Sequence, residues 1–142
     1  RLLLEASAAV NQARQNGATP LLIACQNGDL EIVRLLLEAN AAANQANQDG
    51  TTPLLMACQN GDLEIVRLLL EANAAIDQAT NNGFTPLLSA CQQGHLEIAW
   101  LLLEAGAAIE QPMDDGTTPL SVASFNGEIE CVRLLLEAGA AV

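Results

Sequence analysis

The segment QDGTTPLLMACQNGDLEIVRLLLEANAA, residues 48–75, decides the fold of this chain. Its opening is typical of a helix start that follows a tight turn. Gly50 can take the positive φ that such a turn requires. Thr52 is a favoured N-cap, and proline is favoured at the first helical position. The pattern therefore predicts a short helix from Pro53 to about Asn60.

The second half of the same segment predicts a second helix. Gly61 ends the first helix, and the next helix is expected from about Leu63 to Glu71. Its polar residues Glu64, Arg67 and Glu71 follow helical spacing and form one solvated stripe, while leucine, isoleucine and valine fill the other positions. A helix pair with so much apolar surface must stack against another copy.

The segment recurs along the chain. Thr-Pro-Leu begins at residues 19, 52, 85 and 118, which is a period of 33 residues, and residues 26–42 are identical to residues 59–75. A fixed period of this length indicates a repeat array. The near-identity of the copies fits either recent duplication or a designed origin.

A 33-residue period with a Gly-x-Thr-Pro-Leu start resembles the ankyrin repeat, and the resemblance covers the whole chain. It implies an all-α solenoid of stacked helix–loop–helix units with β-hairpin-like tips. First helices and tips would lie on the concave side, and second helices on the convex side. Residues 1–142 would form a single array, with a partial leading repeat (1–13), three full repeats (14–46, 47–79 and 80–112) and a nearly complete final repeat (113–142).

Two departures from the family pattern affect the details. The histidine that usually follows Thr-Pro-Leu, and that ties adjacent turns by hydrogen bonds, is replaced by Leu22, Leu55, Leu88 and Ser121. Apolar contact is therefore expected to take over there. Near the repeat ends, Asn40 and Asn73 stand where the family usually has glycine, and asparagine can also adopt the left-handed conformation.

The charge balance narrows the class of partner. Seventeen acidic residues face five arginines, the chain has no lysine, and the net charge is −12. Such a surface repels phosphate backbones and anionic lipids, so neither nucleic acid nor a membrane is an expected partner. A basic peptide or a basic protein surface is favoured.

The chemistry-bearing residues do not predict an enzyme, a metal site or a cofactor. Cys25, Cys58 and Cys91 recur at one repeat position, about 8–10 Å apart in a stack, which is too far for a disulfide or a shared zinc ion. Cys131 replaces a core isoleucine, and His95 is expected to be structural or solvated. Four reduced thiols and no visible signal peptide favour an intracellular location, cytoplasmic or nuclear.

The resemblance implies a protein-interaction scaffold that holds a partner protein or extended peptide on its concave face. Aromatic and acidic residues gather in the later repeats, whereas the amides either recognise a peptide backbone or are soluble filler. The partner-binding residues expected from the family pattern are Gln48, Asp49, Thr51, Gln59, Asn60, Asn81, Asn82, Phe84, Gln92, Gln93, Asp114, Asp115, Thr117, Phe125 and Asn126, with Gln15, Asn16, Gln26 and Asn27 at the same positions earlier. Two alternatives are a designed scaffold without a natural partner and a reader of a modified basic tail through an aromatic pocket.

Trp100 and the chain ends carry two further hypotheses. Trp100 stands at the position where the other repeats have arginine. The favoured explanation is that its side chain fills volume given up by Ala99, and the alternative is that it contacts a partner on the convex side. Arg1 begins in mid-helix and Val142 stops before a closing hairpin, so Leu2, Leu3 and Leu4 lack their repeat's first helix. Fraying at that end or end-to-end self-association is expected.

Overall fold

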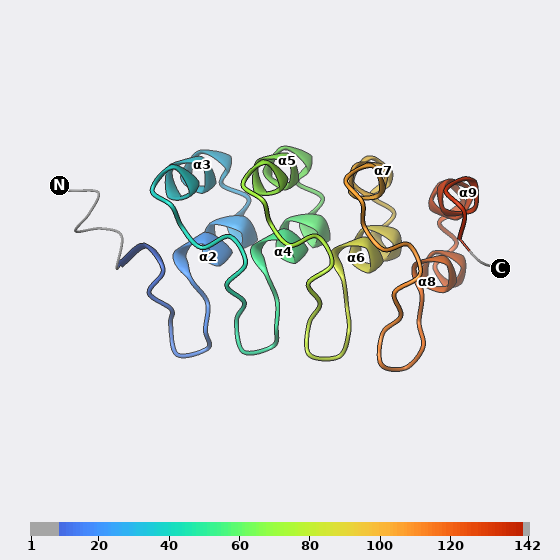
Figure 1. Ribbon diagram of the computed structural model, residues 1–142, viewed down its shortest axis with the longest axis horizontal. Coiled ribbons are helices and arrows are strands. Elements are labelled where there is room, and N and C mark those ends of the chain that lie inside the picture. Colours follow the sequence, from blue (N-terminus) through green and yellow to red (C-terminus); the bar gives the residue numbers. More distant parts are fainter. Residues whose placement is uncertain (1–8, 141–142) are drawn as a thin grey trace.

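The computed structural model describes residues 9–140 and shows successive helix pairs stacked in a row (Figure 1). The expected all-α array is confirmed, and residues 9–140 contain no β-strand. Leu2, Leu3 and Leu4 lie outside the described residues. The first helices of the pairs are α2 (Pro20–Asn27), α4 (Pro53–Asn60), α6 (Pro86–Gln93) and α8 (Pro119–Phe125). The second helices are α3 (Leu30–Glu38), α5 (Leu63–Glu71), α7 (Leu96–Glu104) and α9 (Ile129–Glu137).

Each first helix begins and ends where local chemistry predicts. The Thr52 hydroxyl accepts a hydrogen bond from the Leu55 backbone N–H at 3.1 Å, and Pro53 is the first helical residue. Gly61 ends α4 in the left-handed conformation, with φ of 78°. The predicted bounds of both helices in this repeat are therefore confirmed. No helix within residues 9–140 is long and apolar enough to cross a bilayer.

The residues that depart from the family pattern adopt the conformation and the burial expected of them. Asn40 and Asn73 both adopt φ of 65°, the left-handed conformation that glycine would otherwise supply. The three leucines at the usual histidine position are buried (Leu22, Leu55 and Leu88). Apolar packing therefore replaces the hydrogen bonds that histidine would make there.

The first helices lie closer together than the second helices. Ala57 and Cys58 on α4 and Ala90 on α6 are fully buried and small, so neighbouring first helices make extensive contact. The second helices contact one another much less, although Leu69 and Leu102 close the core beneath them with no exposed surface. This difference curves the array toward the first helices.

The loops between pairs end in hairpin-like tips that are aligned side by side (Figure 1). Within one tip the Asn47 N–H donates to the Thr51 carbonyl at 3.0 Å, and between tips the Asn81 N–H donates to the Asp49 carbonyl at 3.0 Å. Gly50 has φ of 85°, and a Cβ there would lie 2.9 Å from the Asn81 nitrogen. Glycine is thus needed both for the turn and for the close approach of the next tip.

A second set of bonds joins the repeats at the other end of each loop. In each case a side-chain oxygen of one repeat accepts from a backbone N–H of the next repeat. The pairs are Asn11 with Ala42 at 2.8 Å, Asn44 with Ala75 at 2.7 Å and Asp77 with Ala108 at 3.0 Å. Loop residues therefore contribute to the stacking that the helices begin.

Ser89 is an exception to the otherwise well-paired interior. It lies in α6 with no exposed surface, and its hydroxyl has no hydrogen-bond partner among residues 9–140. The same position holds Ile23, Met56 and Val122 in the other repeats. A buried polar group without a partner destabilises a protein by about 1–3 kcal/mol relative to an apolar group of similar shape.

We expect Ser89→Ala to raise the free energy of unfolding by about 1 kcal/mol, because the variant removes a desolvated hydroxyl and leaves little empty space. Urea denaturation followed by circular dichroism measures the change. Ser124→Ala is the control, since the Ser124 hydroxyl is exposed and already donates to the Leu120 carbonyl at 2.7 Å. A clear loss of stability in Ser89→Ala would show that the hydroxyl has a partner.

Candidate functional site

Two adjoining depressions lie on the side of the array formed by the first helices and tips. Phe84, Gln92 and Met113 line both of them. The first has a volume of about 540 Å³ and is completed by Asp49, Thr80, Asn81 and Asn82. The second has a volume of about 460 Å³ and is completed by Asp115, Thr117, Ser121, Val122 and Phe125. Together they form a continuous surface, here named the concave hollow.

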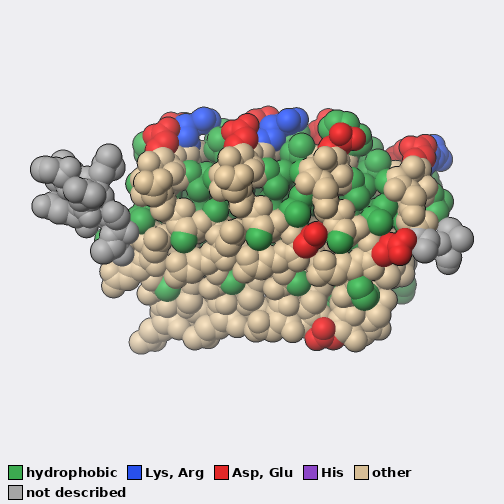
Figure 2. Space-filling model, in the orientation of Figure 1, with side chains coloured by type: hydrophobic (Ala, Val, Ile, Leu, Met, Phe, Trp, Pro, Cys, Tyr) green, Lys and Arg blue, Asp and Glu red, His purple; other side chains and the backbone are tan. Residues whose placement is uncertain are grey.

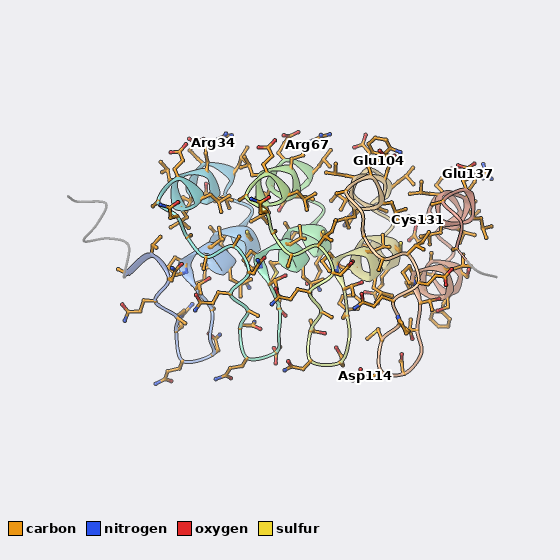
Figure 3. The ribbon with its side chains drawn as sticks, viewed as in Figure 1. Arg34, Arg67, Glu104, Asp114, Cys131 and Glu137 are labelled. Atoms are coloured by element: carbon orange, nitrogen blue, oxygen red, sulfur yellow. The ribbon has the colours of Figure 1, made fainter. Side chains whose placement is uncertain are left out.

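The concave hollow contains about half of the residues expected to bind a partner. Those that line it are Asp49, Asn81, Asn82, Phe84, Gln92, Asp115, Thr117 and Phe125. Those that do not are Gln48, Thr51, Gln59, Asn60, Gln93, Asp114 and Asn126. Figure 3 places Asp114 at the far end of the last tip.

Sequence reasoning missed four residues that line the hollow: Thr80, Met113, Ser121 and Val122. Thr80 and Met113 occupy the tip position that Arg14 and Asn47 hold in earlier repeats. The change from polar residues to methionine was a signal that could have been used.

The apolar part of the hollow comes from two phenylalanines and a methionine. Phe84 is half-buried, whereas Phe125, at the end of α8, is 89% exposed. Phe125 stands where the earlier repeats have Gln26, Gln59 and Gln92, so the aromatic ring is specific to the last repeat. An apolar side chain with this much exposure in the wall of a depression is available to a partner.

The acidic part of the hollow includes Asp49 and Asp115. Hydrogen bonds from the Thr117 side chain and from the Thr117 backbone N–H, which lies 3.0 Å from Oδ1, hold the pKa of Asp115 below its ordinary value. The Asp115 carboxylate therefore stays charged at neutral pH. It can attract a cation beside the phenylalanines.

Several of the expected partner-binding amides instead join the repeats to one another. At the tips, the Gln48 side chain donates to the Gln15 carbonyl at 2.7 Å, and the Asn81 side chain donates to the Gln48 carbonyl at 2.8 Å. Each bond links a residue to its counterpart in the preceding repeat. These amides are therefore neither filler nor fully available donors.

The same role is found at the ends of the first helices. The Asn60 amide donates to the carbonyls of Cys25 at 3.2 Å and Gln26 at 3.1 Å, and the Asn126 amide donates to the Gln92 carbonyl at 3.4 Å. By contrast, three exposed glutamines make no side-chain hydrogen bond within residues 9–140 (Gln59, Gln92 and Gln93). Their amides remain available to a ligand.

The four cysteines are free and buried, which agrees with the expectation that Cys131 belongs to the core. Burial raises the pKa of Cys25 to about 12, with the Asp62 carboxylate adding to the rise. One feature was not foreseen. The thiols of Cys91 on α6 and Cys131 on α9 interact, which raises the pKa of Cys91, with burial adding to the rise, and lowers the pKa of Cys131.

His95 has a structural position, as expected. It precedes α7, and its Nε2 lies 3.4 Å from the Gln59 carbonyl of the preceding repeat. A Cβ added to Gly61 would collide with its ring, so the two repeats are closely fitted there. Residues 9–140 hold no group of three or more metal-binding side chains around it or elsewhere.

Comparison with known proteins supports the repeat assignment. A family model described as ankyrin repeats (3 copies) matches residues 1–80 and again residues 73–142. No curated protein matches the chain.

Proposed function

Since this chain belongs to the ankyrin-repeat family, we propose that it binds a partner protein in the concave hollow between its last two repeats. Ankyrin repeats generally mediate protein–protein interaction and are typically non-catalytic. The observation that carries the proposal is the meeting of Phe84, Met113 and Phe125 in one depression beside Asp115. Apolar anchors with charge around them are typical of interface hot spots.

The ligand that fits this surface best is an extended segment with basic residues. The chain has a net charge of −12, and the carboxylates of the hollow would attract a cationic ligand and speed its association. An extended peptide advances about 3.3 Å per residue, while stacked helices are about 8–10 Å apart. About every third residue of the peptide would then meet an equivalent glutamine, such as Gln59 or Gln92.

We expect the double variant Phe84→Ala and Phe125→Ala to weaken binding at least 30-fold, because truncating an interface anchor costs about 2 kcal/mol or more. Peptides selected from an unbiased display library against the intact array supply the ligand, and calorimetry supplies the affinity. The selected peptides should be rich in lysine or arginine, and their affinity should fall as salt increases.

The control is Trp100→Ala on the opposite side of the array, which should leave this affinity unchanged. Circular dichroism should show the same helix content in all variants, since neither phenylalanine belongs to the buried core. Normal binding by the double phenylalanine variant would reject the concave hollow as the site.

A further inference from the structure

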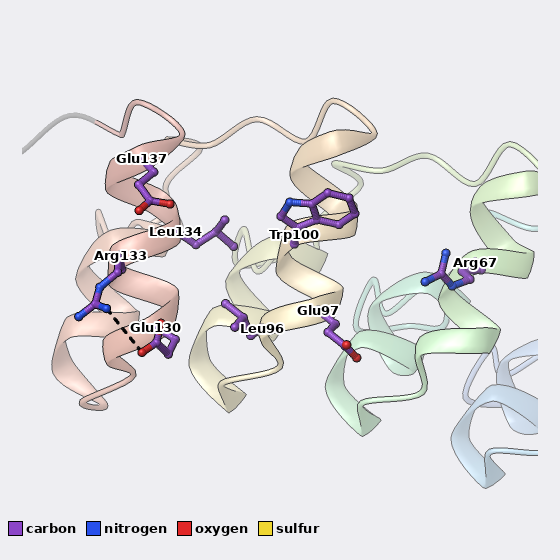
Figure 4. A pocket seen from close by; sticks show the side chains of 8 residues that line it. All are labelled: Arg67, Leu96, Glu97, Trp100, Glu130, Arg133, Leu134 and Glu137. Carbon is purple, nitrogen blue, oxygen red and sulfur yellow. Dashed lines mark ion pairs between the residues drawn. The ribbon is translucent and has the colours of Figure 1, made fainter.

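Another depression lies on the convex side, between the second helices α7 and α9, and has a volume of about 420 Å³ (Figure 4). We name it the convex groove. Leu96 and Trp100 of α7 line it, and Leu134 of α9 points into it from the opposite side. Charged side chains complete its lining: Arg67, Glu97, Glu130, Arg133 and Glu137.

The convex groove is apolar and open to solvent. Leu96 is 38% exposed and Trp100 is 52% exposed, so two large apolar side chains of α7 present surface to solvent in the same groove. Ala99, by contrast, is fully buried. Trp100 is therefore a surface residue that walls a groove, which favours the convex-contact explanation over the filling of volume beside Ala99.

Trp100 also removes an ion pair that the other second helices contain. On α3, α5 and α9 an arginine lies close to the glutamate three residues before it, at 3.9, 3.8 and 3.8 Å. On α7 the arginine position is Trp100, and Glu97 has no ion-pair partner within residues 9–140. Figure 2 shows the result: blue arginines accompany the red carboxylates over α3, α5 and α9, but not over α7.

Three glutamates and two arginines line the convex groove, so its charged rim has a net negative charge. Glu104 and Glu137 likewise form no ion pair within the described part of the chain. An exposed indole beside carboxylates attracts cations, because the face of the ring and the carboxylates both carry negative potential. The two arginines of the lining, Arg67 and Arg133, already pair with Glu64 and Glu130, so neither replaces the arginine that α7 lacks beside Glu97.

We propose that the convex groove docks a basic amphipathic helix of a partner protein, with an arginine or lysine over the Trp100 ring. Leu96 and Trp100 are four residues apart on α7, one helical turn, and Leu134 faces them across the groove. This arrangement matches a helix with apolar residues at i and i+4. Each wall is a nine-residue helix, about 13 Å long, so two to three turns of the ligand would fit.

The chain provides its own reporter for this site, since Trp100 is its single tryptophan and it has no tyrosine. The probe is a synthetic 14-residue helical peptide with one leucine stripe flanked by arginines. We expect saturable change in tryptophan fluorescence with a dissociation constant of about 10 μM or lower. A peptide with glutamate in place of arginine, and one with the leucines scrambled, should each bind at least 10-fold more weakly.

Trp100→Arg is the matched variant, because arginine is the residue that the other repeats carry and it would restore the pair with Glu97. Calorimetry should show at least 10-fold weaker binding of the arginine peptide and unchanged thermal stability. Phe84→Ala with Phe125→Ala should bind the peptide normally, which separates this site from the concave hollow. Equal binding by Trp100→Arg, equal binding of the glutamate peptide, or loss in the double phenylalanine variant would each overturn the proposal.

Discussion

Ile65→Ala should destabilise the array by about 2–4 kcal/mol more than Ile32→Ala, although the two isoleucines lie in identical stretches of sequence (residues 26–42 and 59–75). Helix propensity is therefore the same for the two second helices, and the first helices before them differ only at Ile23 and Met56. The two isoleucines differ in how far neighbouring repeats cover them: Ile65 is 2% exposed and Ile32 is 46% exposed. Truncating a buried isoleucine leaves a cavity, whereas truncating an exposed one changes stability little.

Urea denaturation of the two variants and the parent measures this difference. Leu69→Ala and Leu36→Ala provide a second matched pair, because Leu69 has no exposed surface and Leu36 is partly exposed. Equal losses within either pair would mean that packing inside one repeat, and not contact between repeats, dominates stability.

Raising the pH from 8 to 11 should unfold the protein through its buried thiols. Burial raises the pKa of Cys25 from 9.0 to about 12 and also raises the pKa of Cys58, while the interaction with Cys131, together with burial, raises the pKa of Cys91. The folded state therefore keeps protons that the unfolded state releases. Stability from these thiols is complete below about pH 9 and is lost as the pH rises toward 12.

The expected loss is large. Each thiol whose pKa is raised lowers the free energy of unfolding by about 1.4 kcal/mol per pH unit in that window. Three such thiols give about 4 kcal/mol per unit, against a typical total stability of 5–15 kcal/mol. The chain has neither lysine nor tyrosine, and the interaction with Cys91 lowers the pKa of the fourth thiol, Cys131, so that thiol loses its proton below this window.

Urea midpoints measured at constant ionic strength from pH 8 to 11 check this prediction. Cys58→Ala should remove about one third of the slope, because it deletes one of the three thiols. A flat profile over this range would mean that the thiols are accessible in the folded state.

Local features of the sequence predicted the helices well. The N-cap Thr52, the following proline and the C-terminal Gly61 act on neighbouring residues, so their effect can be read without a structure. Burial of Cys131 was also predictable, because the other repeats have isoleucine at the same position. The pairing of Cys131 with Cys91 was not, because it depends on how two helices from successive repeats approach each other.

The candidate site was predicted less completely for a related reason. An amide on a tip can face solvent or donate to the adjoining repeat, and its type does not distinguish the two. The structure shows that Gln48, Asn60 and Asn81 donate to preceding repeats, whereas Gln92 faces the hollow. Met113 was missed because the family pattern directed attention to other tip positions.

The bonds between successive loops have a consequence for how such a chain changes length. In each of them donor and acceptor lie 31 to 35 residues apart, close to the period of the repeat. Duplicating one 33-residue unit within the array therefore copies a complete set of donors and acceptors, and both junctions remain satisfied. An insertion of any other length would leave a junction without its partners, so this architecture grows or shrinks by whole units.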